Sequence, residues 1–117
     1  MSIQRYETTP RASQAVCYQQ TVYLSGLVAK DLTGDINVQT QSVLDQLDSW
    51  LSSVGSDRRH LLSITFYIKE INFLSQMNTL WEAWIPAGFA PAYTCVEAGL
   101  TSPDILLEAS VIAARRS

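Results

Sequence analysis

The segment Leu61–Lys69, LLSITFYIK, decides the fold, because its side chains alternate in character at every second residue. Its apolar members are Leu62, Ile64, Phe66 and Ile68. The residues between them are Ser63, Thr65, Tyr67 and Lys69. Successive side chains of a strand point to opposite faces, so this pattern predicts a central β-strand with one strongly apolar face.

The residues before this strand carry a helical period. In residues 37–54, apolar side chains recur at steps of three and four, which indicates one buried helical stripe. The stripe consists of Val43, Leu44, Leu47, Trp50, Leu51 and Val54. Asp35 or Asn37 can cap the start of the helix, and Gly55 is suited to a left-handed stop.

A second helix is predicted directly after the central strand. Asn72 offers a cap, Trp84 lies in the last turn, and Pro86 ends the helix. Its apolar stripe consists of Phe73, Met77, Leu80, Trp81 and Trp84. Tryptophan and methionine at helical spacing are typical of a core, so we interpret this stripe as packing against the sheet.

Five further segments are rich in β-forming residues. They are Ile3–Glu7, Ala15–Tyr18, Thr21–Ser25, Ala92–Ala98 and Leu106–Ile112. Gln19-Gln20 is expected to form a hairpin turn, and Ser25-Gly26 a bulge or a close backbone approach. The last two segments are sequence neighbours, so an antiparallel pair is expected. The order β-β-β-α-β-α-β-β predicts one α+β domain over residues 1–117, with two helices on one face of the sheet.

Composition excludes several classes of protein. The chain is 47% hydrophobic and 16% charged, as a globular domain of 117 residues should be. A net charge of -3 and a pI near 4.9 argue against a general nucleic-acid binder, and Arg58, Arg59 and His60 are expected at a solvated end. The N-terminus lacks a secretory signal and no apolar run is long enough for a membrane span, which indicates a cytoplasmic protein. Cys17 and Cys95 are then reduced thiols, and with one histidine they predict neither a metal site nor a cofactor.

The segment Ala90–Leu100, APAYTCVEAGL, is a candidate wall of a binding site. In an extended conformation, Tyr93, Cys95 and Glu97 share one face. A phenol and a thiol side by side can line a site. The alternative is an ordinary strand with a small buried cysteine, and the residues alone leave both interpretations open.

The far face of the predicted sheet indicates a second subunit. Two helices cover only one face, and the residues assigned to the other, including Ser63, Thr65, Tyr67 and Ser110, carry few charges. A face of this kind often packs against another copy of the chain. Closed symmetry would then create identical clefts between subunits.

Six stretches together resemble the RidA/YjgF/YER057c family, also called the L-PSP family. They are Tyr23–Gly26, Val54–Ser56, Ile64–Ile68, Met77-Asn78 with Trp81-Glu82, Ala90–Val96 and Leu107–Ala113. The resemblance covers nearly the whole chain. It implies a chorismate-mutase-like fold with a mixed sheet, and a homotrimer that holds a small-molecule ligand in clefts between its subunits.

The resemblance also implies a reaction. Active members hydrolyse reactive enamines and imines, such as 2-aminoacrylate, to a keto acid and ammonia. By resemblance, Glu108 handles the water or proton, and Cys95 is the family cysteine. Asn78 and the pair Ser25-Gly26 complete the surroundings. The alternatives are a solvent-facing Glu108, a core thiol at Cys95, and an Asn78 that only ties a loop to the helix.

Two positions depart from the family pattern. The N-terminal tyrosine of the family falls near Ala12 in this chain, and the second departure concerns the carboxylate-binding arginine. Where the family has an arginine that binds the substrate carboxylate, this chain has Tyr93. A guanidinium forms two charge-assisted bonds and a phenol one neutral bond, so the change costs about 2–4 kcal/mol of carboxylate binding, a factor of roughly 30 to 1,000. Either the ligand lacks a carboxylate, or Arg11, beside the position of a family tyrosine, supplies the cation.

Two functions from different classes follow from the resemblance. The first is a deaminase-like hydrolase with altered ligand specificity, and the second is a non-catalytic binding or regulatory trimer that keeps the cleft. Endoribonuclease activity, claimed for some relatives, is a weaker alternative for so acidic a chain.

Overall fold

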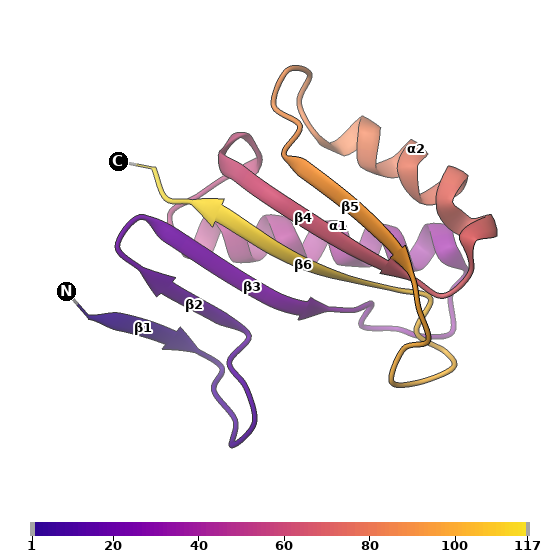
Figure 1. The fold of residues 1–117 in the computed structure, drawn as a ribbon, viewed down its shortest axis with the longest axis horizontal. Helices are drawn as coiled ribbons and strands as arrows, with labels where there is room; N and C mark the ends of the chain where they lie inside the picture. Colours follow the sequence, from indigo (N-terminus) through magenta and orange to yellow (C-terminus); the bar gives the residue numbers. More distant parts are fainter. Residues whose placement is uncertain (1, 117) are drawn as a thin grey trace.

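The computed structural model describes residues 2–116, and Figure 1 traces their course through a six-stranded sheet and two α-helices. The elements are β1 (Ile3–Tyr6), β2 (Ala15–Tyr18), β3 (Thr21–Leu27), α1 (Ile36–Ser53), β4 (Leu61–Ile68), α2 (Leu74–Trp84), β5 (Ala92–Glu97) and β6 (Leu107–Ala114), with 3-10 turns at Arg58–His60 and Ile71–Phe73. The predicted order of elements is confirmed. Within the described residues, neither helix combines the length and apolarity needed to cross a membrane.

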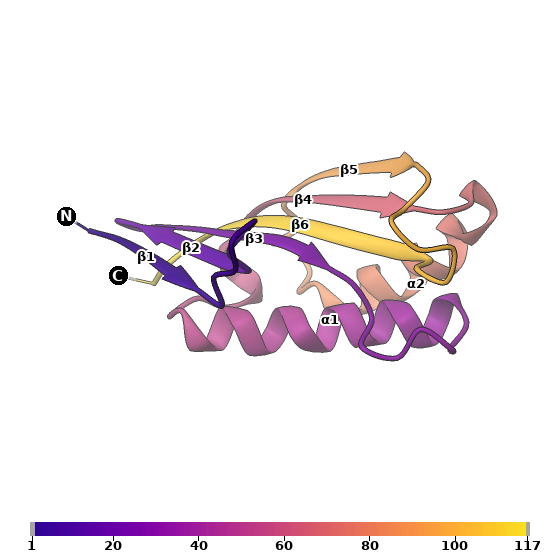
Figure 2. The same cartoon turned by 90° about the horizontal axis from the view of Figure 1, so that it is seen from below.

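The strands lie in the order β1-β2-β3-β6-β4-β5. Only β4 and β5 run parallel, and the other neighbours are antiparallel, so the sheet is mixed. Figure 2 shows α1 and α2 on the same face of this sheet, as predicted. The other face carries no helix, and we call it the open face.

The predicted pairing of the last two strands is wrong. β6 lies between β3 and β4, and β5 pairs with β4 at the sheet edge. Two physical reasons account for this. A strand–helix–strand crossover such as β4–α2–β5 places its strands in parallel. In addition, β6 buries every second residue, as a central strand does, whereas β5 is mostly exposed and suits an edge.

The core lies between the helices and the covered face of the sheet. Ile64, Phe66 and Ile68 are buried there as predicted, but Leu62 is 50% exposed and Leu61 is buried instead. The pairing of β4 with β6 slips between Leu61 and Ser63, which turns the side chains over at this point. The matching buried residues of β6 are Leu107, Ala109, Val111 and Ala113.

Local turn chemistry agrees with the sequence at four positions. Gln19 adopts φ +54° in the predicted hairpin turn. Gly26 adopts φ +63° where the pairing of β3 with β6 is irregular, which confirms the predicted bulge. Asp35 caps α1 by accepting a hydrogen bond from the Val38 backbone at 3.0 Å. Gly55, at φ +80°, follows the helix as predicted.

The predicted start of α2 is one residue too early, because a cap at Asn72 implies a helix from Phe73. Asn72 lies inside the 3-10 turn Ile71–Phe73, and the α-helix begins at Leu74 without a side-chain cap. The turn is instead held from the sheet, because the Glu97 carboxylate accepts a hydrogen bond from the Ile71 backbone at 2.7 Å. Glu97 of β5 therefore accepts a backbone hydrogen bond at the start of this segment, where a side-chain cap at Asn72 was predicted.

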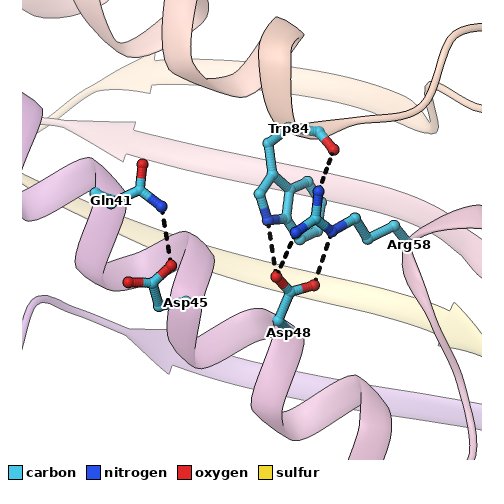
Figure 3. Close-up of polar contacts among 5 residues, drawn as sticks. All are labelled: Gln41, Asp45, Asp48, Arg58 and Trp84. Carbon is cyan, nitrogen blue, oxygen red and sulfur yellow. Dashed lines mark hydrogen bonds and ion pairs between the residues drawn. The ribbon is translucent and has the colours of Figure 1, made fainter.

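Arg58 is not a solvated end, which corrects the expectation for this residue. Its guanidinium binds both carboxylate oxygens of Asp48 at 2.8 and 2.6 Å and the Trp84 carbonyl at 2.7 Å (Figure 3). It also lies 4.4 Å from the centre of the Trp84 ring. The hydrogen bonds to Asp48 raise the pKa of Arg58. These contacts join α1 to the end of α2.

Arg58→Ala is expected to destabilise the protein by about 1–2 kcal/mol. The loss exceeds that of an ordinary surface pair because the contact is bidentate and adds a backbone bond and a cation–π contact, although both side chains are 38% exposed. Urea unfolding would measure it. Arg59→Ala is the matched control and should change the free energy of unfolding by less than about 0.5 kcal/mol. Equal effects of the two variants would contradict the prediction.

Candidate functional site

Three of the predicted site residues meet between α2 and β5. Asn78 projects from α2, and Tyr93 and Cys95 project from β5 toward the helical layer. The register explains this direction, because Tyr93 lies beside Ile64 and Cys95 beside Phe66, whose side chains are buried under the helices. We call these three residues the α2–β5 group.

Tyr93 is held in place by one hydrogen bond and two rings. Its hydroxyl donates to Asn78 Oδ1 at 2.6 Å. Its ring centre lies 5.9 Å from that of Phe66 and 6.3 Å from that of Trp81. Burial is the main cause that raises the pKa of Tyr93, and the Glu82 carboxylate adds to it. The side chain is 39% exposed, so a neutral phenol faces the surface here.

Cys95 is half-buried and packs against the hydrophobic core. Burial raises the pKa of the Cys95 thiol, and the hydrogen bond with Tyr93 offsets only part of the effect. The thiol is therefore protonated at neutral pH. This favours a neutral packing or hydrogen-bonding role over that of a thiolate nucleophile, since the thiolate is the reactive form.

Two other predicted residues meet on the open face. β6 buries Leu107 and Ala109 under the helices, so Glu108 between them points to the opposite side. Its carboxylate lies over Gly26, where a Cβ atom would be 3.7 Å from Glu108 Oε2. The left-handed backbone explains a glycine at position 26, whereas the 3.7 Å distance is an ordinary contact that a Cβ atom could make.

Ser25 adjoins Gly26 in this second group, whereas Arg11 lies in the loop between β1 and β2. The Ser25 hydroxyl donates to the Ser13 carbonyl at 3.4 Å, which ties β3 to the loop between β1 and β2. Arg11 lies in the same loop with an exposed side chain. Its backbone N–H donates to Thr9 Oγ1 at 3.2 Å. Within residues 2–116, no hydrogen bond or ion pair brings its guanidinium to Glu108. We call Ser25, Gly26 and Glu108 the open-face group.

The two groups lie on opposite faces of the sheet. Glu108 pairs with Tyr67 across the ladder, on the face away from the helices, whereas Tyr93 and Cys95 point into the helical layer. One copy of the chain cannot bring the groups into a single cleft. A site that uses both needs a second copy.

A hollow of about 380 Å³ adjoins the α2–β5 group. Its lining comprises Asn78, Trp81, Glu82, Ile85, Pro86, Ala87, Gly88, Ala90 and Tyr93. The wall is mostly apolar, with a few polar groups at one side, which is the usual character of a small-molecule site. Within the described residues, no three His, Cys, Asp or Glu side chains converge so as to hold a metal ion.

Comparison with known proteins identifies the family of this chain. A family model described as endoribonuclease L-PSP matches residues 2–115. The chain belongs to this family. The RutC family protein YoaB of Escherichia coli K12 is 35% identical over 114 residues, which are 97% of this chain and 99% of the relative.

Solved structures agree with the family assignment. A YjgF family protein from Neisseria meningitidis is 38% identical, with a TM-score of 0.95 over 100% of this chain and 98% of its own. An uncharacterized protein from Pseudomonas aeruginosa is 37% identical, with a TM-score of 0.95 over 98% of this chain and 100% of its own. The predicted RidA/YjgF resemblance and fold class are confirmed.

Glu82 was not predicted from the sequence to be a site residue of this L-PSP family member. The structure places it on the lining of the hollow, four residues after Asn78. Residues four apart share a helix face, so the spacing to Asn78 was the available signal. Arg58 and Asp48 were also missed as a pair, since they are ten residues apart and lie in different elements, α1 and the 3-10 turn that follows it.

Proposed function

We propose that this chain hydrolyses enamines or imines in clefts between the subunits of a homotrimer, with ligand specificity altered by Tyr93. The observation that carries the proposal is the Glu108 carboxylate over Gly26 on an otherwise weakly charged face. Within residues 2–116, no cation forms an ion pair with it. Such a carboxylate can accept a proton from a water molecule that attacks an imine carbon.

The position of the two groups on opposite faces supports an assembly. The open face exposes apolar and aromatic side chains, including Tyr23 at 48% and Leu62 at 50%. Covering this face with a second copy would bury them and bring an α2–β5 group toward an open-face group. The resemblance to trimeric family members points the same way. Two free cysteines are consistent with a cytoplasmic location, and the reaction requires no cofactor.

A non-catalytic binding or regulatory trimer is the second candidate. One observation favours it: the Tyr93 hydroxyl donates to Asn78, so it is not available as a donor to a ligand carboxylate. A protein that lost the clamp but kept the cleft could bind a ligand without hydrolysing it. The endoribonuclease activity in the family description is supported less, because a pI near 4.9 does not suit a polyanion.

Tyr93→Arg is expected to raise kcat/KM for 2-aminoacrylate and related imines about 30- to 1,000-fold. The reason is a bidentate bond to the carboxylate in place of a phenol that is already engaged. The imines are generated in situ from serine or threonine by a dehydratase, and keto-acid release is followed. Tyr93→Phe removes the hydroxyl without adding charge and should show no gain.

The outcome separates the candidates. A gain in Tyr93→Arg with no acceleration by the natural chain would favour the binding protein. Equal rates for the two proteins would show that a cation at this position is irrelevant. Arg11→Ala tests the remaining source of a cation, because a loss of carboxylate-dependent binding in this variant would assign the clamp to Arg11.

A further inference from the structure

The hollow beside Tyr93 has a charge that suits one class of ligand. Its volume of about 380 Å³ falls at the lower end of the range for small-molecule sites. Glu82 is its one acidic lining residue, and no lysine, arginine or histidine of the described chain lines it. Because the Tyr93 phenol is neutral, the hollow carries one negative charge. It would repel a carboxylate and attract a cation.

The neighbouring arginines do not reverse this charge. Arg58 and Arg59 line a different hollow, together with Asp48 and Asp57. Arg58 is bound to both oxygens of Asp48. Arg59 lies 5.5 Å from the centre of the Phe89 ring, and neither arginine contributes to the lining beside Tyr93.

Two side chains of the hollow, Tyr93 and Glu82, can accept a hydrogen bond from a ligand, beside the Asn78 amide, whose N–H groups can donate. The Tyr93 hydroxyl already donates its hydrogen bond to Asn78 Oδ1, so its oxygen can act only as an acceptor toward a ligand. The Glu82 carboxylate is an acceptor as well. A protonated nitrogen carries the N–H groups that both oxygens can accept.

The walls of the hollow suit an apolar body attached to that nitrogen. The Trp81 and Tyr93 rings lie 6.3 Å apart at 37°, and Ile85 and Pro86 extend the apolar surface. An aromatic face attracts a cation that lies within about 6 Å of the ring centre. The hollow thus combines an anion, two acceptors and aromatic walls.

We propose that this hollow selects iminium ions derived from apolar amines without a carboxylate, and holds their protonated nitrogen between Glu82 and Tyr93. This inference rests on the proposed function. The water oxygen bonds to the imine carbon, the C–N bond breaks, and the nitrogen leaves with its electron pair as an ammonium ion. The balance is R₂C=NHR′⁺ + H₂O → R₂C=O + R′NH₃⁺, with no oxidant or reductant. Glu108 of a second copy would guide the water.

A matched pair of substrates tests the proposal. Phenethylamine with an amine oxidase yields an imine without a carboxylate. Phenylalanine with an amino-acid oxidase yields the corresponding imine that carries a carboxylate. Ammonia release is followed for both imines. In each assay the concentration of the chain does not exceed that of the oxidase. We expect a higher kcat/KM for the carboxylate-free imine, by about 10-fold or more, because attraction replaces repulsion.

Glu82→Gln supplies the decisive variant, because it keeps the shape and removes the charge. It should lower kcat/KM for the carboxylate-free imine about 3- to 10-fold, as suits an exposed, charge-assisted contact. Glu70→Gln is the matched control, since Glu70 is exposed and lies outside the hollow, and it should leave the rate unchanged. Preference for the carboxylate imine, or an unaffected Glu82→Gln, would overturn the inference while the proposed hydrolysis stands.

A third outcome separates the inference from the proposed function. If neither imine is hydrolysed faster with the protein, imine hydrolysis fails. Calorimetric titration with phenethylammonium then decides whether the hollow prefers cations. Binding that weakens in Glu82→Gln supports the assignment of the hollow, and no binding to the natural chain overturns it.

Discussion

Glu108→Gln is expected to lower kcat for imine hydrolysis about 10²- to 10⁴-fold while leaving the fold intact. An amide cannot accept the proton of the attacking water, and loss of a general base has effects of this size. The fold should persist because Glu108 lies half-exposed on the open face, outside the buried core. Ammonia release measures the rate, and urea unfolding checks the stability. Glu70→Gln again serves as the matched control.

Mixed assemblies would show where the site lies. The Glu108→Gln chain is combined in equal amounts with an Asn78→Ala chain, which loses the hydrogen bond to Tyr93. If each cleft takes its open-face group from one subunit and its α2–β5 group from the next, about a quarter of the clefts are intact and activity returns in proportion. If both groups served the same cleft from one chain, no intact cleft would form. Absence of recovery would therefore contradict an inter-subunit site.

Gln39→Met is expected to destabilise the protein by about 3–5 kcal/mol. The Gln39 side chain is fully buried in α1, and its amide donates to the carbonyls of Gly34 and Asp104 at 3.1 and 3.0 Å. Its carbonyl accepts from the Leu106 backbone at 3.0 Å. Methionine fills the same space but removes the side-chain partner of these three backbone groups and of the Leu32 carbonyl, which accepts at 3.4 Å. A backbone group that stays buried without a partner costs about 1–3 kcal/mol.

The consequence extends to the open face, because Leu106 lies two residues before Glu108. Gln39 joins α1, the loop before it and the segment that leads into β6. Gln41→Met is the matched control on the same helix, where the one hydrogen bond of the exposed amide within residues 2–116 is to Asp45 at 2.9 Å. We expect it to change the free energy of unfolding by less than about 0.5 kcal/mol in urea titrations. A similar loss in both variants would contradict a special role for Gln39.

Much of the fold could be predicted because its signals are local. Alternation in residues 61–69 and helical spacing in residues 37–54 report which side chains face the core. Gly55 and Gly26 indicate left-handed backbone conformations, which few other residues adopt. These patterns hold before any tertiary contact forms.

The errors fall where one element depends on another. Leu62 is exposed because β4 slips against β6, a strand more than forty residues later. Asn72 is not a helix cap because Glu97, on β5, binds the turn before α2. β6 is inserted between β3 and β4 because the crossover through α2 places β5 on the other side of β4.

The candidate site shows the same division. The family motifs identified Cys95, Asn78, Glu108 and Tyr93 as candidate site residues. Tyr93 stands where the family has its carboxylate-binding arginine, so the sequence alone showed that this cation is absent. The engagement of Tyr93 with Asn78, and the presence of Glu82 in the hollow, appear only when α2 packs beside β5. Side-chain identity limits which chemistry is available, and packing decides which groups meet.

By itself, the sequence determined the order of the elements, the apolar faces, the turns and the family, because each follows from residues close together in the chain. Only the tertiary structure decided that Glu108 and Tyr93 lie on opposite faces of the sheet. That result depends on which strands become neighbours and in which register, since a shift of one residue turns every side chain of a strand to the other face.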